Sequence, residues 1–167
     1  MKFYSSEKKQ RLTLSQAMVK FLQAQYSEYD GVEHRFFQGI WGIFGHGNVS
    51  GLSQALVGYG DDLPYHQPTN EQSMVHAATG FARTMRRKAT MACTTSIGPG
   101  ATNMITGAAT VTIGRISVLL LPWDYYATRR QGKALQDMGH LSLDDMLLED
   151  TFCVVRRDYG CLARAGQ

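Results

Sequence analysis

The sequence predicts an α/β fold in which a parallel sheet is flanked by helices on both faces. Short apolar segments without polar alternation, which are typical of strands buried on both faces, alternate along the chain with segments of helical periodicity. The apolar segments 39–44 and 90–95 also run directly into glycine-containing turns. The 167 residues, 44% hydrophobic and 19% charged, have the composition of a single globular domain, which we assign to residues 1–167.

Local signals place each element. Thr13 precedes apolar residues at helical spacing and caps a predicted helix over 14–25, whereas the mixed, charged segment 26–38 is predicted to be a loop. Asn70 is the expected N-cap of a long helix that opens with Glu71. In chain order the other predictions are a strand over 39–44, a helix over 49–56, a short strand over 63–66, a helix over 71–85, a strand over 90–95, a helix from Ala101, a strand over 116–121, a short helix over 144–149 and a last strand over 152–155.

Composition and charge exclude several classes of function. The formal net charge is +3 and the basic residues fall in short separate runs, so we expect a solvated surface and no nucleic-acid partner. Residues 1–11 lack the apolar core of a signal peptide, and the apolar run 116–121 is too short to cross a bilayer, so no membrane partner is expected. The three cysteines form no C-x-x-C pair and are odd in number, which favours reduced thiols in the cytoplasm.

Three loops beside the predicted strands are the candidate ligand-binding segments. They span residues 45–48, 68–72 and 96–103. Ligands of parallel α/β sheets bind beyond the carboxyl ends of the strands, so we expect these loops to line one crevice. The histidines show no metal-ligand spacing, but His46 stands between two glycines at a strand end, where it faces a pocket or serves a structural turn.

The loop 96–103 and the residue Glu71 each have a structural interpretation. A dinucleotide fingerprint requires glycine at its sixth position, where this chain has Asn103, so a tight β-to-α turn built on Gly98 and Gly100 is favoured. A carboxylate in the first turn of a helix is stabilised by the helix dipole, which is sufficient to explain Glu71. Glu71 becomes a candidate for chemistry because it is expected at the rim of the sheet, near both glycine-rich loops.

The three loops together resemble those of the thiamine-diphosphate enzymes related to acetolactate synthase. The N-terminal, pyrimidine-binding domain of that family has a strand ending in a glycine-rich turn, a glutamate that opens a long alanine-rich helix, and the motif T-S-x-G-P-G-A-x-N after a strand. The corresponding segments of this chain read IFGHGN at 43–48, NEQSMVHAATGFAR at 70–83 and TTSIGPGATN at 94–103. Order, spacing and structural context agree, so the combination is far more specific than any one motif.

The resemblance implies a role for each candidate residue. Glu71 corresponds to the catalytic glutamate that hydrogen-bonds to the pyrimidine ring of thiamine diphosphate. The cofactor-binding residues implied beside it are Gly98, Pro99, Gly100 and Asn103. His46 and Asn48 correspond to positions near the reacting end of the cofactor, where they are expected to contact the substrate.

Within the family, the chain is most similar to the hydrolases of inositol catabolism that open the ring of a trihydroxycyclohexane-1,2-dione. The phrases that carry this likeness are FGHGNV at 44–49, NEQ at 70–72, TTSIGPGA at 94–101, VLLLP at 118–122 and ATR at 127–129. The implied substrate is therefore a small cyclic dione. Trp123 departs from the pattern, because glycine is usual there.

The family holds the diphosphate through Mg²⁺ in a separate domain marked by Gly-Asp-Gly, which this chain does not contain. The resemblance therefore implies that the Mg²⁺ ligands and the diphosphate-binding domain belong to another part of the enzyme. It also implies an active site shared between subunits of a homo-oligomer. We expect this chain to be the pyrimidine-binding part only, with the middle and diphosphate-binding domains absent.

Two alternatives remain open at the level of the sequence. The first is an acetolactate synthase-like or 2-oxo acid decarboxylase domain, because the glycine and glutamate motifs serve the cofactor and not the substrate. The second is a catalytically inactive fragment that only associates with full-length subunits.

Overall fold

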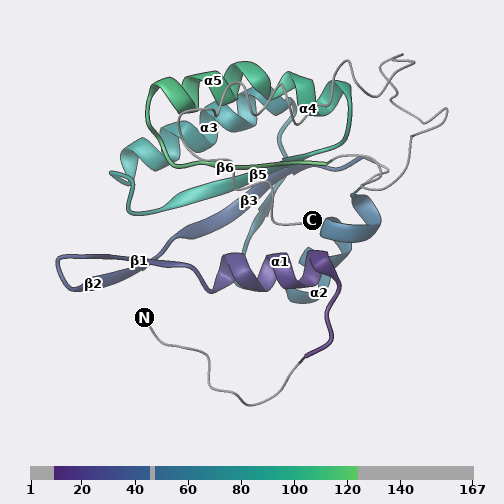
Figure 1. The fold of residues 1–167 in the computed structure, drawn as a ribbon, viewed down its shortest axis with the longest axis horizontal. Coiled ribbons are helices and arrows are strands. Elements are labelled where there is room, and N and C mark those ends of the chain that lie inside the picture. Colours follow the sequence, from purple (N-terminus) through teal and green to yellow (C-terminus); the bar gives the residue numbers. More distant parts are fainter. Residues whose placement is uncertain (1–9, 46–47, 124–167) are drawn as a thin grey trace, which may run out of the picture.

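Four parallel strands form the sheet at the centre of this protein, in the order β4-β3-β5-β6 (Figure 1). The computed structural model describes residues 10–45 and 48–123. In chain order its elements are α1 (Leu14–Gln23), β1 (Tyr26–Tyr29), β2 (Val32–Arg35), β3 (Phe37–Ile43), the π-helical turn η1 (Val49–Ser53), α2 (Gln54–Tyr59), β4 (Tyr65–His66), α3 (Glu71–Thr84), β5 (Thr90–Thr95), α4 (Pro99–Asn103), α5 (Ile105–Ile113) and β6 (Leu119–Pro122).

The strand order contains a reversal between β3 and β5. From β3 the chain passes to β4 on one side, then returns across β3 through α3 to pair β5 on the other side. Helices α1 and α2 lie on one face of the sheet, and α3, α4 and α5 lie on the other (Figure 1). The prediction of a parallel sheet covered on both faces is confirmed. A reversal of this kind opens a crevice outside the carboxyl ends of the two strands that flank it.

The central strand β5 divides the core into two halves. All of its residues are buried, and successive side chains point to opposite faces of the sheet. Ala92 packs in the cluster formed with α1 and α2, whereas Met91 and Cys93 pack in the cluster formed with α3 and α5. The same alternation directs Thr94 toward the α1 and α2 face and Thr95 toward the α3 face.

Two predicted helix caps are confirmed. The Thr13 hydroxyl accepts a hydrogen bond from the backbone N–H of Gln16, whose side chain in turn accepts from the Thr13 N–H, which completes a capping box. The Asn70 side chain accepts from the Ser73 N–H and caps α3. Because the Asn70 cap fixes where α3 begins, it also fixes Glu71 as the first residue of that helix.

The predicted loop over 26–38 is wrong. Residues 26–35 form an antiparallel hairpin in which Tyr29 pairs with Val32 around the two-residue turn Asp30-Gly31. Both turn residues have positive φ, 52° and 77°. An Asp-Gly pair between two β-forming residues is the sequence signal of such a hairpin, and it outweighs the polarity of the surrounding segment.

Other boundaries differ by a few residues. The helix expected from Ala101 begins at Pro99, and the helix expected over 49–56 is divided into η1 and α2. The strand expected over 116–121 is β6, which begins three residues later, at Leu119. The predictions for 144–149 and 152–155 lie outside the described residues.

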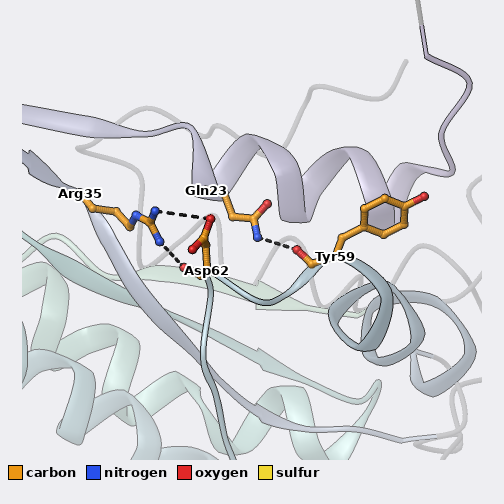
Figure 2. A network of polar contacts seen from close by, with 4 residues as sticks. All are labelled: Gln23, Arg35, Tyr59 and Asp62. Carbon is orange, nitrogen blue, oxygen red and sulfur yellow. Dashed lines mark hydrogen bonds and ion pairs between the residues drawn. The ribbon is translucent and has the colours of Figure 1, made fainter.

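Polar contacts tie α1 to the last residue of α2 and the hairpin to the segment after α2 (Figure 2). Gln23 donates a hydrogen bond of 2.5 Å to the Tyr59 carbonyl, and Arg35 contacts both the backbone carbonyl and the carboxylate of Asp62. The ion pair spans 3.7 Å, and the Asp62 side chain is 70% exposed. Exposed pairs of this kind contribute at most about 1 kcal/mol, so the network orients these segments more than it stabilises the fold.

The contact of α5 with α3 requires a glycine at position 107. A Cβ there would lie 2.6 Å from the Cβ of Val75, which is fully buried. We expect Gly107→Ala to lower the free energy of unfolding by about 1–3 kcal/mol, because overpacking outweighs the better helix propensity of alanine. Urea denaturation measures this loss. Gly58→Ala in α2, where a Cβ meets nothing within 4 Å, is the matched control and should be neutral or stabilising; equal effects of both substitutions would contradict the argument.

Candidate functional site

The candidate site lies at the carboxyl end of the sheet, where the turns after β3 and β5 approach the start of α3. β3 and β5 are neighbours in parallel register, with Ile43 opposite Thr95, so their carboxyl ends lie side by side. The segment 96–98 then leads from β5 into α4, and α3 contacts both β5 and α4. Two of the three predicted loops, 68–72 and 96–103, are thus described in full, while the third is described only at Gly45 and Asn48.

Glu71 is half-buried and is held by a residue far away in the sequence. Its Oε2 atom accepts a hydrogen bond of 2.7 Å from the Nδ2 atom of Asn103, at the end of α4. The carboxylate also lies at the N-terminus of α3, where the helix dipole stabilises negative charge. The two residues that the sequence predicted to act on one ligand are therefore in direct contact.

Gly100 keeps the space beside Glu71 open. A Cβ at this position would lie 3.2 Å from Glu71 Oε1, 2.9 Å from Thr95 Oγ1 and 2.6 Å from Ser96 Oγ. Three side-chain oxygens therefore surround one bare backbone position. This close approach explains the glycine, since any larger residue would displace at least one of these oxygens.

Gly98 and Pro99 shape the turn that presents Gly100. Gly98 is buried and has a φ of +59°, a conformation that other residues rarely adopt. Pro99 follows as the first residue of α4, where its fixed φ suits a helix start. The predicted cofactor-binding residues Gly98 to Gly100 thus form the end of the turn and the start of α4, and their contact with a cofactor stays a prediction.

Thr95 is the residue of this site that the sequence reasoning missed. Its side chain is fully buried, and its Oγ1 atom has no hydrogen-bond partner within the described part of the chain. A usable signal was present, because strand alternation places Thr95 on the same face as Met91 and Cys93, toward α3.

Asn48 is buried and hydrogen-bonds to both the turn after β3 and strand β5. Its side chain is fully buried, donates to Thr94 Oγ1 at 3.3 Å and to the Thr95 carbonyl at 3.2 Å, and accepts from the Gly45 N–H at 3.1 Å. Asn48 therefore links the turn after β3 to β5. Its contact with substrate stays a prediction, and His46, for which the same contact is predicted, lies outside the described residues.

Trp123, the departure from the family pattern, lies beside this cross-link. Its backbone N–H donates to the Thr95 carbonyl at 3.2 Å, and its ring comes within 3.7 Å of the Cβ that Gly51 would carry. The indole therefore packs against η1, on the face of the sheet opposite α3, and away from Glu71.

Among the described residues, neither a reactive thiol nor a cluster of metal ligands accompanies Glu71. Burial raises the pKa of the Cys93 thiol to about 12, so it stays protonated at neutral pH, and it points toward the Met74 carbonyl at 3.8 Å. In residues 10–45 and 48–123 no three His, Cys, Asp or Glu side chains gather as a metal site. No helix of this same part is long and apolar enough to cross a membrane.

The arrangement fits a flat nitrogen heterocycle better than a metal or a phosphate. It offers one carboxylate whose orientation is fixed by an amide, a bare glycine beside it and a buried hydroxyl that has no hydrogen-bond partner among the described residues. A carboxylate is an acceptor that matches a ring N–H, and a bare glycine lets a ring approach the backbone closely. The residues present therefore fit the pyrimidine ring of thiamine diphosphate.

The sequence of this chain matches a family of known proteins. The sequence profile of the family described as "Thiamine pyrophosphate enzyme, N-terminal TPP binding domain" matches residues 12–145. Among curated proteins, the chain is 48% identical over 157 residues to 3D-(3,5/4)-trihydroxycyclohexane-1,2-dione hydrolase of Geobacillus thermodenitrificans (strain NG80-2), covering 94% of this chain and 25% of that protein. The proteins of the same name from Bacillus thuringiensis (strain Al Hakam) and Bacillus anthracis (strain A0248) are each 46% identical, with 94% of this chain and 24% of theirs covered.

The chain spans about a quarter of the length of these relatives. The match includes β3, α3, β5 and α4, and hence every described residue of the candidate site. The chain therefore belongs to the family of thiamine pyrophosphate enzymes, as an N-terminal TPP-binding domain.

Proposed function

We propose that this chain binds the aminopyrimidine ring of thiamine diphosphate and that Glu71 is its catalytic residue. The observation that carries the proposal is the contact of Glu71 with Asn103 next to the bare backbone of Gly100. Asn103 binds the Oε2 atom of Glu71, so we assign the other oxygen, Oε1, to the ring nitrogen. Gly98, Pro99 and Gly100 form the turn against which the ring packs.

The work of the chain is to position the ring and to exchange one proton with it. When bound, thiamine diphosphate supplies a nucleophilic carbon that attacks a ketone. Glu71 holds a proton between its carboxylate and the ring nitrogen, and thereby favours the tautomer of the ring that acts as a base. Asn103 orients the carboxylate through Oε2 and leaves Oε1 for this exchange.

The proposed reaction of the complete enzyme is hydrolysis of a carbon–carbon bond that opens the ring of trihydroxycyclohexane-1,2-dione. The names of the relatives support this substrate, at 46–48% identity over nearly all of this chain. We further propose that a diphosphate-binding domain of another subunit holds Mg²⁺ and the diphosphate. This proposed arrangement implies a homo-oligomeric enzyme, which we place in the cytoplasm.

Calorimetry with thiamine diphosphate and Mg²⁺ tests the proposal. The chain is titrated alone and mixed with the remainder of a relative from which the matching N-terminal domain has been deleted. We expect binding only in the mixture, together with hydrolysis of the cyclic dione. A folded chain that gains no cofactor binding in the mixture would contradict the proposal, whereas association without binding would identify an inactive partner domain.

A further inference from the structure

The hydroxyl group of Thr95 is buried, and the fold alone does not explain the loss of stability that this burial causes. Its side chain is fully buried, and in the described part of the chain Oγ1 meets no hydrogen-bond partner. Burying a hydroxyl without a partner destabilises a protein, and valine would fill the same volume without that cost. The adjacent Thr94 differs, because its hydroxyl donates to the Leu121 carbonyl at 2.9 Å and accepts from Asn48.

The Thr95 hydroxyl lies at the candidate site. Thr95 Oγ1 and Glu71 Oε1 lie 2.9 Å and 3.2 Å from the same point, the position of a Cβ on Gly100. The opposite carboxylate oxygen, Oε2, is already held by Asn103. Asn103 on α4 thus holds one oxygen of the Glu71 carboxylate, and the hydroxyl of Thr95 on β5 is a potential donor to the other.

We propose that Thr95 is a positioning residue for Glu71, and that its hydroxyl donates a hydrogen bond to Glu71 Oε1 when the aminopyrimidine ring is bound. This inference rests on the proposed function. A carboxylate oxygen has two lone pairs, so Oε1 accepts from Thr95 and still faces the ring nitrogen. Asn103 and Thr95 together then fix the carboxylate at two points, which sets its plane relative to the ring.

A double-mutant cycle tests the inference in the completed assembly, with thiamine diphosphate and Mg²⁺ as the probe. The variants are Thr95→Val, which keeps the shape and removes the hydroxyl, Thr95→Ser, which keeps the hydroxyl, and Glu71→Gln. We expect Thr95→Val to bind the cofactor at least about tenfold more weakly, as the loss of one hydrogen bond to a charged group implies. Thr95→Ser should retain near wild-type affinity, and Thr95→Val should have little further effect in the Glu71→Gln background.

Stability provides the second readout. Thr95→Val should leave the unfolding midpoint of the chain unchanged or raise it, because no hydrogen bond among the described residues is lost. Thr94→Val is the matched control on the adjacent residue and should lower that midpoint, since it removes two hydrogen bonds. A Thr95→Val variant that unfolds more easily would show a structural role for the hydroxyl and overturn the inference.

The outcomes separate this inference from the proposed function. If the wild-type assembly binds the cofactor and the Thr95→Val assembly binds it with the same affinity, the role of Thr95 is overturned and the proposed function stays intact. If Thr95→Val weakens cofactor binding by the same factor in the wild-type and the Glu71→Gln backgrounds, Thr95 does not act by positioning Glu71. No cofactor binding by the wild-type assembly overturns the proposed function itself.

Discussion

Replacing Glu71 with glutamine is expected to lower the turnover of the completed enzyme by about 10²- to 10⁴-fold, the usual contribution of a positioned acid–base group. The amide keeps the size of the side chain, and its oxygen can still accept from Asn103 Nδ2, so the local geometry is preserved. What it loses is the ability to take up and return a proton. Steady-state hydrolysis of the cyclic dione at saturating cofactor measures the effect.

The control for this prediction is the same chemical change elsewhere on the chain. Glu33 lies exposed on β2 and pairs directly with Glu28 across the hairpin. Glu33→Gln should leave turnover unchanged and slightly favour the hairpin, because it relieves the repulsion of two like charges. Turnover in Glu71→Gln within a few-fold of wild type, with the fold intact, would remove Glu71 from the catalytic role.

Replacing Gly100 with alanine is expected to have the largest effect on cofactor binding. The added Cβ would lie within 3.2 Å of oxygens of Glu71, Thr95 and Ser96, so it occupies the space through which a ring would reach the carboxylate. We expect calorimetry of the assembly to detect no binding of thiamine diphosphate. The forced displacement of buried side chains should also lower the free energy of unfolding by about 1–3 kcal/mol.

Gly80→Ala separates this steric effect from the general cost of changing a glycine. Gly80 lies within α3, and a Cβ there meets nothing within 4 Å. Alanine at an open helical position should stabilise the chain by about 0.5–1 kcal/mol. If Gly100→Ala binds the cofactor like the wild type, the bare backbone at this position has no part in recognition.

Local signals in the sequence determined where α3 and β5 lie. Asn70 as a cap and the apolar spacing after it placed Glu71 at the start of a helix, and the run 90–95 became β5 with the same limits. Both signals act over a few residues, through capping hydrogen bonds and side-chain periodicity, so they can be recognised without tertiary contacts. The hairpin at 26–35 was equally local, and its Asp30-Gly31 turn was detectable.

The tertiary structure decided how the parts of the site meet. Glu71 and Asn103 are 32 residues apart, and they touch because the sheet order brings the start of α3 and the end of α4 to one edge. No local pattern encodes the reversal between β3 and β5, since strand order depends on which helices pack on which face.

The sequence by itself thus determined the fold class and the family, and it predicted Glu71 as the acidic residue of the site. Only the packed structure showed that Asn48 is buried as a link between the turn after β3 and β5. It also showed that the Thr95 hydroxyl beside Gly100 has no hydrogen-bond partner in the part of the chain that the structure describes. The physical reason is that motifs record residue types along the chain. Burial and hydrogen bonding instead depend on contacts among residues that are distant in the sequence.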